Sequence, residues 1–328
     1  MQTVENADIM GKKVADQLVE TICRAGIRHI YAVTGDSLNE VNDAVRRAGT
    51  VRWVHVRHEE SGAFAAAAES ELNGIACCAG SSGPGHVHLI NGLYDAHRSN
   101  CPVLAIASTC PPDQFGTGYF QETDPIRLFD DCSGYNQMAV TPAQFARMLP
   151  AALQHAIHRR EVAVVGLPGD VAASPCAESP GASGPLPSHG IYRPLDGELR
   201  QLAEMIGSAE RITVFCGIGA REAHDEVVRL AAMLKAPVAY TFKAKMEVQY
   251  DNPYEIGMTG LLGLPSAYGA MHESDLLLLL GTDFPYDCFL PSECRIAQVD
   301  IRPERIGRRA RVELVLAGDV KETLQALF

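Results

Sequence analysis

Short apolar runs alternate with segments of helical periodicity along the whole chain. Val14, Leu18 and Ile22 recur at helical spacing before Gly26 and predict a helix over residues 10–26. In the first half, strands are expected at 27–33, 51–56, 74–79, 103–108 and 162–167, and helices at 10–26, 38–47, 59–70, 85–93 and 145–158. Strands and helices that alternate in this way predict a parallel sheet covered by helices.

A stretch rich in Pro, Gly and Ser, without periodicity, separates this half from a second unit of the same style. In the second unit, strands are expected at 211–216, 237–241, 275–280, 295–299 and 312–316, and helices near 197–207, 220–234 and 319–327. The predicted fold is therefore α/β, with two doubly wound parallel-sheet domains. Their predicted bounds are 1–171 and 195–328, with a linker over 172–194, and 328 residues suffice for two cores.

Charge and composition argue against two classes of function. The net charge is −12 and there is no basic block, so nucleic-acid binding has no electrostatic basis. The longest purely apolar run, Leu276–Leu280, is too short to span a bilayer, and residues 1–8 do not read as a signal peptide. Ten cysteines without any Cys-x-x-Cys lie mostly in apolar segments, which predicts reduced, buried thiols and a cytoplasmic location.

The junction between the valine-rich run at 51–56 and the alanine-rich segment after it carries two acids, Glu59 and Glu60. The first turn of a helix favours carboxylates through its unpaired N–H groups, so both acids could simply be solvated. A strand-to-helix junction of an α/β fold is also where ligands bind, and the small alanines let another surface approach closely. From the residues alone, both interpretations stay open for Glu59.

Three segments together resemble the thiamine-diphosphate (ThDP) enzymes. They are Arg57-His58-Glu59-Glu60, Gly80-Ser-Ser-Gly-Pro-Gly85 and Gly118-Tyr-Phe-Gln-Glu-Thr123. Within that superfamily the chain is most similar to bacterial pyruvate oxidase, the ubiquinone-dependent pyruvate dehydrogenase. The similarity runs from about residue 10 to the C-terminus, so the first domain is expected to be of the pyrimidine-binding type.

The resemblance implies roles for residues of this first domain. Glu59 would be the buried carboxylate bonded to the pyrimidine N1′, which lets the cofactor remove its own C2 proton. Phe120 and Gln121 would line the substrate pocket as an apolar wall and an amide. Further pyrimidine-side positions are Gly35, Gly83, Pro84, Gly85 and Asn91. His86 and His88 are given no role, because a histidine on a buried helix is more often structural.

The second unit resembles the FAD-binding middle domain of pyruvate oxidase. The FAD-binding residues that the resemblance implies are Gly217, Gly219, Thr259, Gly260, Leu261, Leu262, Thr282, Asp283, Phe284, Pro285, Tyr286, Asp300, Gly318 and Asp319. Gly-x-Gly after a strand also favours a dinucleotide pyrophosphate at a helix N-terminus, and an acid at a strand end suits a ribose hydroxyl. Ala244 departs from relatives that often carry Gly at this position.

Members of the family hold the diphosphate through Mg²⁺ in a third domain, with Gly-Asp-Gly and a downstream Asn. In this chain Gly-Asp occurs at 35–36, 169–170 and 318–319, each time followed by Ser or Val, so we expect no metal ligands here and Mg²⁺ only with the missing domain. The resemblance also implies a homo-oligomer with pyrimidine domains at the interface. A separate chain that carries the diphosphate domain is a second possible partner.

The leading hypothesis is a ThDP- and FAD-dependent oxidative decarboxylation of pyruvate, or another small 2-oxo acid, to acetate and CO₂, with electrons passing to a quinone. Phe120 and Gln121 favour it over acetolactate synthase. A second hypothesis is a non-catalytic or truncated flavin- and ThDP-binding subunit of a split enzyme. A plain NAD-dependent dehydrogenase is disfavoured, because neither unit carries the full Gly-x-Gly-x-x-Gly fingerprint.

Overall fold

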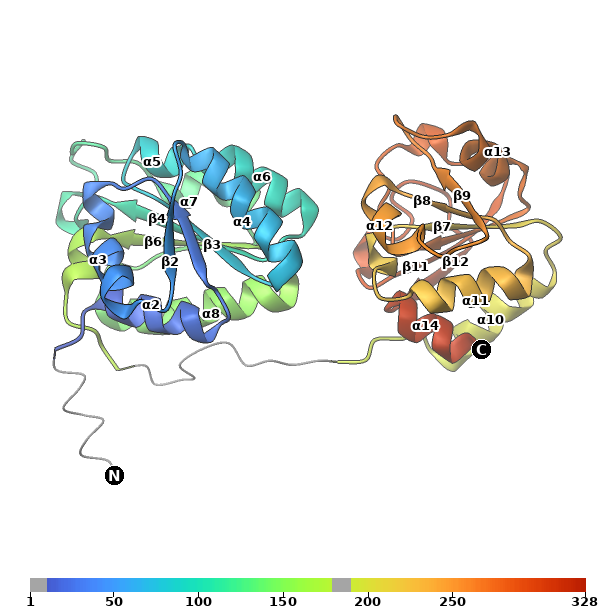
Figure 1. The fold of residues 1–328 in the computed structure, drawn as a ribbon, viewed down its shortest axis with the longest axis horizontal. Coiled ribbons are helices and arrows are strands. Elements are labelled where there is room, and N and C mark those ends of the chain that lie inside the picture. Colours follow the sequence, from blue (N-terminus) through green and yellow to red (C-terminus); the bar gives the residue numbers. More distant parts are fainter. Residues whose placement is uncertain (1–10, 179–189) are drawn as a thin grey trace, which may run out of the picture. The chain divides into compact units, whose positions relative to one another are not determined.

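The computed structural model describes residues 11–178 and 190–328, and the chain divides into two compact units, residues 1–188 and 189–328. Each unit contains a six-stranded sheet whose strands all run parallel. The prediction of two doubly wound α/β domains is therefore confirmed. Figure 1 shows the two sheets with helices on both faces.

In the first unit the strand order is β2-β1-β3-β4-β6-β5. The strands are β1 (His29–Ala32), β2 (Arg52–His55), β3 (Ala76–Gly80), β4 (Val103–Thr109), β5 (Tyr135–Met138) and β6 (Val162–Pro168). The helices are α2 (Val14–Arg24), α3 (Asn39–Ala48), α4 (Glu59–Asn73), α5 (Pro84–Val87), α6 (Ile90–Ser99), α7 (Pro125–Leu128), α8 (Pro142–Arg159) and α9 (Gly169–Ala173). Helices α2, α3 and α8 cover one face of the sheet, and α4 and α6 cover the other.

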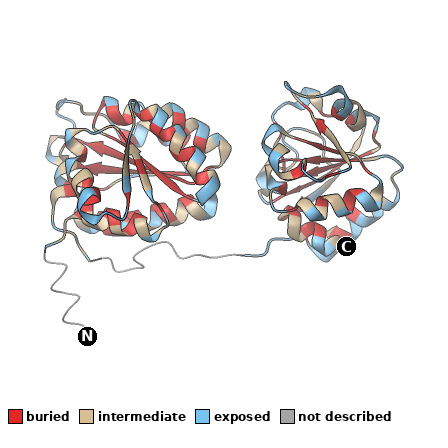
Figure 2. Ribbon diagram, viewed as in Figure 1, coloured by how far each residue is buried: buried red, intermediate tan, exposed pale blue. Residues whose placement is uncertain are grey.

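The central strands are buried on both faces, as a parallel sheet between two helical layers requires. In β3, Cys77 and Ala79 join the core under α2, α3 and α8, whereas Ala76 and Cys78 join the core under α4 and α6. Figure 2 shows this buried sheet between helices whose outer faces are exposed. The apolar run therefore needs no alternation with polar residues.

In the second unit the strand order is β12-β11-β10-β7-β8-β9, the order of the doubly wound dinucleotide-binding folds. The strands are β7 (Ile212–Cys216), β8 (Val238–Tyr240), β9 (Glu255–Met258), β10 (Leu276–Leu280), β11 (Arg295–Asp300) and β12 (Leu314–Ala317). The helices are α10 (Asp196–Gly207), α11 (His224–Leu234), α12 (Lys245–Val248), α13 (Pro265–Glu273) and α14 (Val320–Leu327). The five leucines of β10 point alternately into the core under α10, α11 and α14 and into the core under α13.

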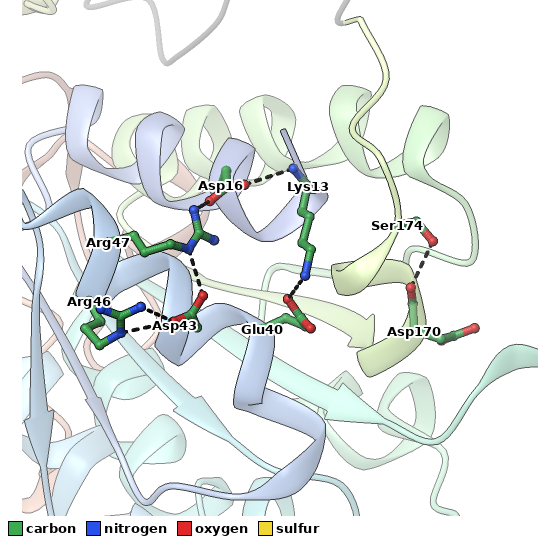
Figure 3. A network of polar contacts seen from close by, with 8 residues as sticks. All are labelled: Lys13, Asp16, Glu40, Asp43, Arg46, Arg47, Asp170 and Ser174. Carbon is green, nitrogen blue, oxygen red and sulfur yellow. Dashed lines mark hydrogen bonds and ion pairs between the residues drawn. The ribbon is translucent and has the colours of Figure 1, made fainter. Parts of the chain in front are cut away.

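A network of ion pairs joins α2 to α3 on the surface of the first unit (Figure 3). Lys13 Nζ lies 2.7 Å from Glu40 Oε2, and Arg47 lies 2.7 Å both from Asp16 Oδ1 and from Asp43 Oδ2. The Arg47 and Arg46 guanidiniums beside Asp43 lower the pKa of that exposed carboxyl. Exposed pairs contribute little each, so the packing of α3 on α2 rests mainly on the apolar core that the two helices share.

The first unit extends past the predicted boundary at Val171. Ala172 is buried in its core, the Val14 N–H donates to the Ser174 carbonyl at 2.9 Å, and Pro175 forms an isolated bridge with Lys13. Residues 172–176 therefore pack against the first unit. The rest of the predicted linker lies partly outside the described residues, which omit 179–189.

All ten cysteines lie in the described ranges and are free. Six are buried, and burial raises the pKa of the Cys78 and Cys216 thiols to about 12, which keeps them protonated. Cys288 is exposed, so the prediction of buried thiols is wrong for that residue.

Candidate active site

The first candidate site lies at the carboxyl ends of β1 and β3. These strands are neighbours in the sheet, and the chain continues from them to opposite sides, so their end loops form the switch point where α/β folds bind ligands. Gly35 follows β1, and the turn of residues 81–85 follows β3. The sequence alone could not place these two loops side by side.

The two loops are in direct contact. A Cβ on Gly35 would lie 2.3 Å from the Ser81 hydroxyl oxygen, so this close approach requires a glycine. Ser37 Oγ lies 2.9 Å from Ser81 Oγ and accepts a hydrogen bond of 2.9 Å from the Ser82 N–H. The predicted site residue Gly35 therefore serves loop packing in this structure, and Ser37 is a contact that sequence reasoning missed.

Glu59 is the first residue of α4, and it is 7% exposed. One carboxylate oxygen, Oε1, faces the glycine turn, since a Cβ on Gly85 would lie 3.4 Å from it. The other oxygen, Oε2, lies 3.0 Å from His88 Nδ1. The neighbouring Glu60 accepts a short hydrogen bond from the Asn91 side chain, so the two acids have different environments. The predicted site residue Asn91 therefore bonds Glu60 rather than Glu59.

The segment with Phe120 and Gln121 packs on the glycine turn. Gln121 has a left-handed backbone with φ of 59°, its Oε1 accepts a hydrogen bond of 3.1 Å from Ser82 Oγ, and a Cβ on Gly83 would lie 2.8 Å from Gln121 Cβ. Phe120 is 76% exposed. The structure therefore brings Gly83, Pro84, Gly85 and Gln121 together near Glu59, with Phe120 on the surface of the same segment.

A single carboxylate holds the loop that precedes this segment. Glu122 accepts hydrogen bonds from the backbone N–H groups of Gly116, Gly118 (2.7 Å) and Tyr119 (3.0 Å). These bonds lower the pKa of Glu122. Three donors around one acid order an otherwise irregular loop, a role that the sequence pattern did not reveal.

His86 anchors the other end of the loop from within the core. It is fully buried, with Nδ1 2.8 Å from the Ser108 carbonyl and Nε2 2.6 Å from the Thr123 hydroxyl. Because the carbonyl can only accept, Nδ1 carries the proton, and neutral Nε2 accepts from Thr123. Burial lowers the pKa of His86. These contacts support a structural role for His86, as expected from the sequence.

We expect acid to destabilise the protein in part through His86. Since its pKa is lowered in the folded state, the unfolded chain binds more protons below its ordinary value of about 6.5, and the free energy of unfolding falls as pH decreases through that range. Denaturant titrations at pH 7 and pH 5 should show that the free energy of unfolding decreases less for His86→Gln than for the wild type. Equal decreases would contradict the assignment of this pH dependence to His86.

The second candidate site lies at the switch point of the second unit, between β7 and β10. Gly217 and Gly219 follow β7, and their N–H groups donate to the carbonyls of Leu280 (2.8 Å) and Gly281 (3.0 Å). A Cβ on Gly217 would lie 2.3 Å from the Gly281 carbonyl oxygen. Both glycines are therefore needed for the contact between the two loops, whether or not a dinucleotide binds there.

The loops beside this switch point present an apolar surface. Leu261 and Leu262 are exposed, and a Cβ on Gly260 would lie 3.0 Å from the ring of Phe284. Phe284 makes an edge-to-face contact with Tyr286, with ring centroids 5.5 Å apart. Thr259 Oγ1 is buried and has no hydrogen-bond partner among the described residues. A buried hydroxyl without a partner costs free energy unless water or a ligand satisfies it, so the Thr259 hydroxyl is available to a polar ligand.

The acids of the second site differ in environment. Asp300, at the end of β11, is buried, and burial raises the pKa of its carboxyl, whose Oδ1 accepts a hydrogen bond of 2.9 Å from the Arg302 N–H. Asp283, which follows Thr282, pairs with Arg308 (3.8 Å) and Arg309 (3.4 Å).

Two further predicted residues have structural partners. Asp319 caps α14, because its Oδ1 accepts a hydrogen bond of 3.1 Å from the Glu322 N–H. Gly318 packs against Pro194, since a Cβ on Gly318 would lie 2.7 Å from Pro194 Cδ. These contacts account for both residues without a ligand. Pro285, which lies between Phe284 and Tyr286, is exposed.

Comparison with known proteins identifies the family. Residues 12–128 match the family model "Thiamine pyrophosphate enzyme, N-terminal TPP binding domain", and residues 199–327 match "Thiamine pyrophosphate enzyme, central domain". The chain belongs to the thiamine pyrophosphate enzyme family. The match supports thiamine diphosphate as the cofactor.

Three relatives are similar to this chain over most of its length. The chain is 50% identical over 318 residues to a 42.6 kDa protein of the isoamylase 3′ region of Pseudomonas amyloderamosa, covering 96% of this chain and 80% of that protein. It is 32% identical to pyruvate oxidase of Lactiplantibacillus plantarum, covering 92% and 51%, and 30% identical to chloroplastic acetolactate synthase of Arabidopsis thaliana, covering 96% and 49%. The chain thus spans about half the length of these last two relatives.

Within residues 11–178 and 190–328, no helix combines the length and apolar composition that crossing a bilayer requires.

Proposed function

We propose that this chain is part of an enzyme that decarboxylates pyruvate, or another small 2-oxo acid, oxidatively with ThDP and FAD, passing the electrons to a quinone. The observation that carries the proposal is the buried Glu59 carboxylate facing the Gly83–Gly85 turn at a strand switch point. Because the chain spans about half of the pyruvate oxidase it resembles, we propose that a further domain or partner chain holds the diphosphate and Mg²⁺. The active form would be a homo-oligomer or such a complex.

The residues of the first unit fit ThDP. ThDP supplies the carbon nucleophile that attacks the carbonyl of a 2-oxo acid. The chain itself would contribute Glu59, whose buried carboxylate accepts a hydrogen bond from the pyrimidine and favours its imino form. The Gly83-Pro84-Gly85 backbone would lie along the ring without side-chain obstruction, and Gln121 would orient the carboxylate of the substrate.

The residues of the second unit fit FAD. The unpartnered Thr259 hydroxyl would bond the cofactor, and the exposed Leu261 and Leu262 would cover apolar ring surface. The strand order and the glycine-lined switch point suit a dinucleotide, with Asp300 beside a ribose.

The test is to follow the flavin absorbance of the purified full-length protein on addition of pyruvate, ThDP and Mg²⁺. Bleaching that requires both ThDP and pyruvate, together with acetate and CO₂ as products, supports the proposal. Flavin that stays oxidised under these conditions, in the protein with any partner chain supplied, contradicts it.

Acetolactate synthase activity is the second candidate, because the chain is almost as similar to acetolactate synthase as to pyruvate oxidase. The same assay separates the two. Condensation of two 2-oxo acids would yield acetolactate without net reduction of the flavin. We favour oxidation because of the Phe120-Gln121 pair, which resembles the oxidase pocket.

We expect Asp300→Ala to lower the affinity for FAD by about 10- to 100-fold, the effect of losing one hydrogen bond to a charged group. The measurement is flavin content after gel filtration and titration of the apoprotein. Asp275→Ala is the control, because Asp275, like Asp300, accepts backbone hydrogen bonds with its side chain but immediately precedes β10, at the opposite end of the sheet. Unchanged flavin content in Asp300→Ala would exclude Asp300 from the site.

A further inference from the structure

Three metal-ligating side chains converge at Glu59. The ligand atoms of His58, Glu59 and His88 all lie within 4.8 Å of one another, and within the described ranges of the chain this is the one group of three or more such residues. The imidazole rings of His58 and His88 stack with centroids 4.4 Å apart. His88 Nδ1 is already 3.0 Å from Glu59 Oε2. Two imidazoles and one carboxylate are thus grouped closely enough to become ligands of one ion after small side-chain rotations.

We propose that His58, Glu59 and His88 bind a divalent transition-metal ion such as Zn²⁺, and that the ion excludes ThDP from the site. Two histidines and one glutamate are a recurrent ligand set for zinc sites that keep one coordination position open. Mg²⁺ prefers oxygen ligands and octahedral geometry, so the ion needed for diphosphate binding does not compete for these imidazoles.

The site can close around an ion with small side-chain movements. Ligand atoms about 2.0–2.2 Å from a tetrahedral Zn²⁺ are roughly 3.3–3.6 Å apart, so separations of up to 4.8 Å must shorten by at most about 1.5 Å. The side chains of His58 and His88 are 48% and 43% exposed, which leaves them room to rotate and gives the ion a path from solvent. Glu59, which is buried at the start of α4, stays fixed and supplies the negative charge.

The exclusion of ThDP rests on the proposed function. Glu59 presents Oε2 to His88 and Oε1 to the glycine turn, so an ion would bind on the Oε2 side. It would neutralise the carboxylate and draw it toward the two imidazoles, and Oε1 could then no longer serve the pyrimidine nitrogen as a fixed, negatively charged acceptor. The ion would therefore act as a competitive inhibitor with respect to ThDP. Raising ThDP would relieve the inhibition, whereas raising Mg²⁺ would not.

The first experiment titrates the ThDP-free full-length protein with Co²⁺, whose visible absorption reports nitrogen and oxygen ligands, and then displaces it with Zn²⁺. The background from ten cysteines and other histidines is removed by comparing variants. The His58→Ala and His88→Ala variants should each bind one equivalent of Co²⁺ fewer than the wild type, or bind that equivalent at least about tenfold more weakly. His155→Ala is the matched control, since His155 also contacts a glutamate, Glu161, at 2.7 Å but belongs to no group of three metal-ligating side chains in the described part of the chain.

Each outcome decides the proposal. If the two site variants bind Co²⁺ as the wild type and His155→Ala do, with unchanged circular dichroism, the metal site is excluded. If the ion binds at this site but does not raise the ThDP concentration needed for half-maximal binding, the shared use of Glu59 is excluded. Because the Co²⁺ titration contains neither ThDP nor pyruvate, its failure leaves the proposed decarboxylation untouched, and failure of the flavin assay leaves the metal site untouched.

Discussion

Glu59→Gln is expected to reduce ThDP-dependent turnover of 2-oxo acids at least about 100-fold, within the range for loss of a group that assists proton transfer. The amide has nearly the same shape as the carboxylate, so the packing against Gly85 should persist. It carries no negative charge, and it therefore cannot stabilise the protonated pyrimidine nitrogen. The measurement is steady-state turnover of the full-length protein with saturating ThDP, Mg²⁺ and pyruvate.

Glu60→Gln is the control for this experiment. The two acids are adjacent in sequence and lie in the same first turn of α4, but Glu60 bonds Asn91 and is more exposed. Its substitution should change turnover far less than Glu59→Gln. Flavin content should stay at the wild-type level in both variants, because FAD is proposed to bind the second unit. Comparable activity in the two variants would remove Glu59 from its proposed role.

The sequence pattern predicted the central strands and the edge strands β2 and β12, but it missed the edge strands β5 and β9. Apolar runs such as the leucines of β10 are buried on both faces, so their composition alone identifies them. Strands β5 and β9 lie at sheet edges, and most of their residues are only partly buried. Such strands carry no continuous apolar run, and the pattern gave no reason to predict them.

The features of the candidate site that are local in sequence were predictable, whereas the contacts that depend on the strand order were not. The glycine turns and Glu59 were found because they are local in sequence and resemble a known family. The contact of His88 with Glu59 joins residues 29 positions apart, and the loop contacts of Gly35 with Ser81 depend on which strands are neighbours. A parallel sheet assembles these loops only after the strand order is set, and no periodicity in the chain specifies that order.

The same dependence makes Gly217 a sensitive position. Gly217→Ala is expected to destabilise the second unit by about 1–3 kcal/mol or more, the range for overpacking a site that cannot relax. The backbone of Gly217 has φ of −98°, which alanine adopts readily, so the cost is steric. The new Cβ would lie 2.3 Å from the Gly281 carbonyl oxygen and 2.6 Å from Thr282 Cα, and both are backbone atoms.

Tryptophan fluorescence and circular dichroism together distinguish the unfolding of the two units in this experiment. Trp53 is the single tryptophan and lies in the first unit, so its fluorescence follows that unit, whereas circular dichroism follows both. Gly217→Ala should move part of the circular dichroism transition to lower denaturant and leave the Trp53 transition in place. Gly269→Ala, inside α13 with nothing within 4 Å of the new Cβ, should instead stabilise by up to about 1 kcal/mol through helix propensity. If Gly217→Ala and Gly269→Ala shifted the circular dichroism transition equally, the change in backbone freedom would explain both effects. The contact between the loops after β7 and β10 would then not decide the stability of this site.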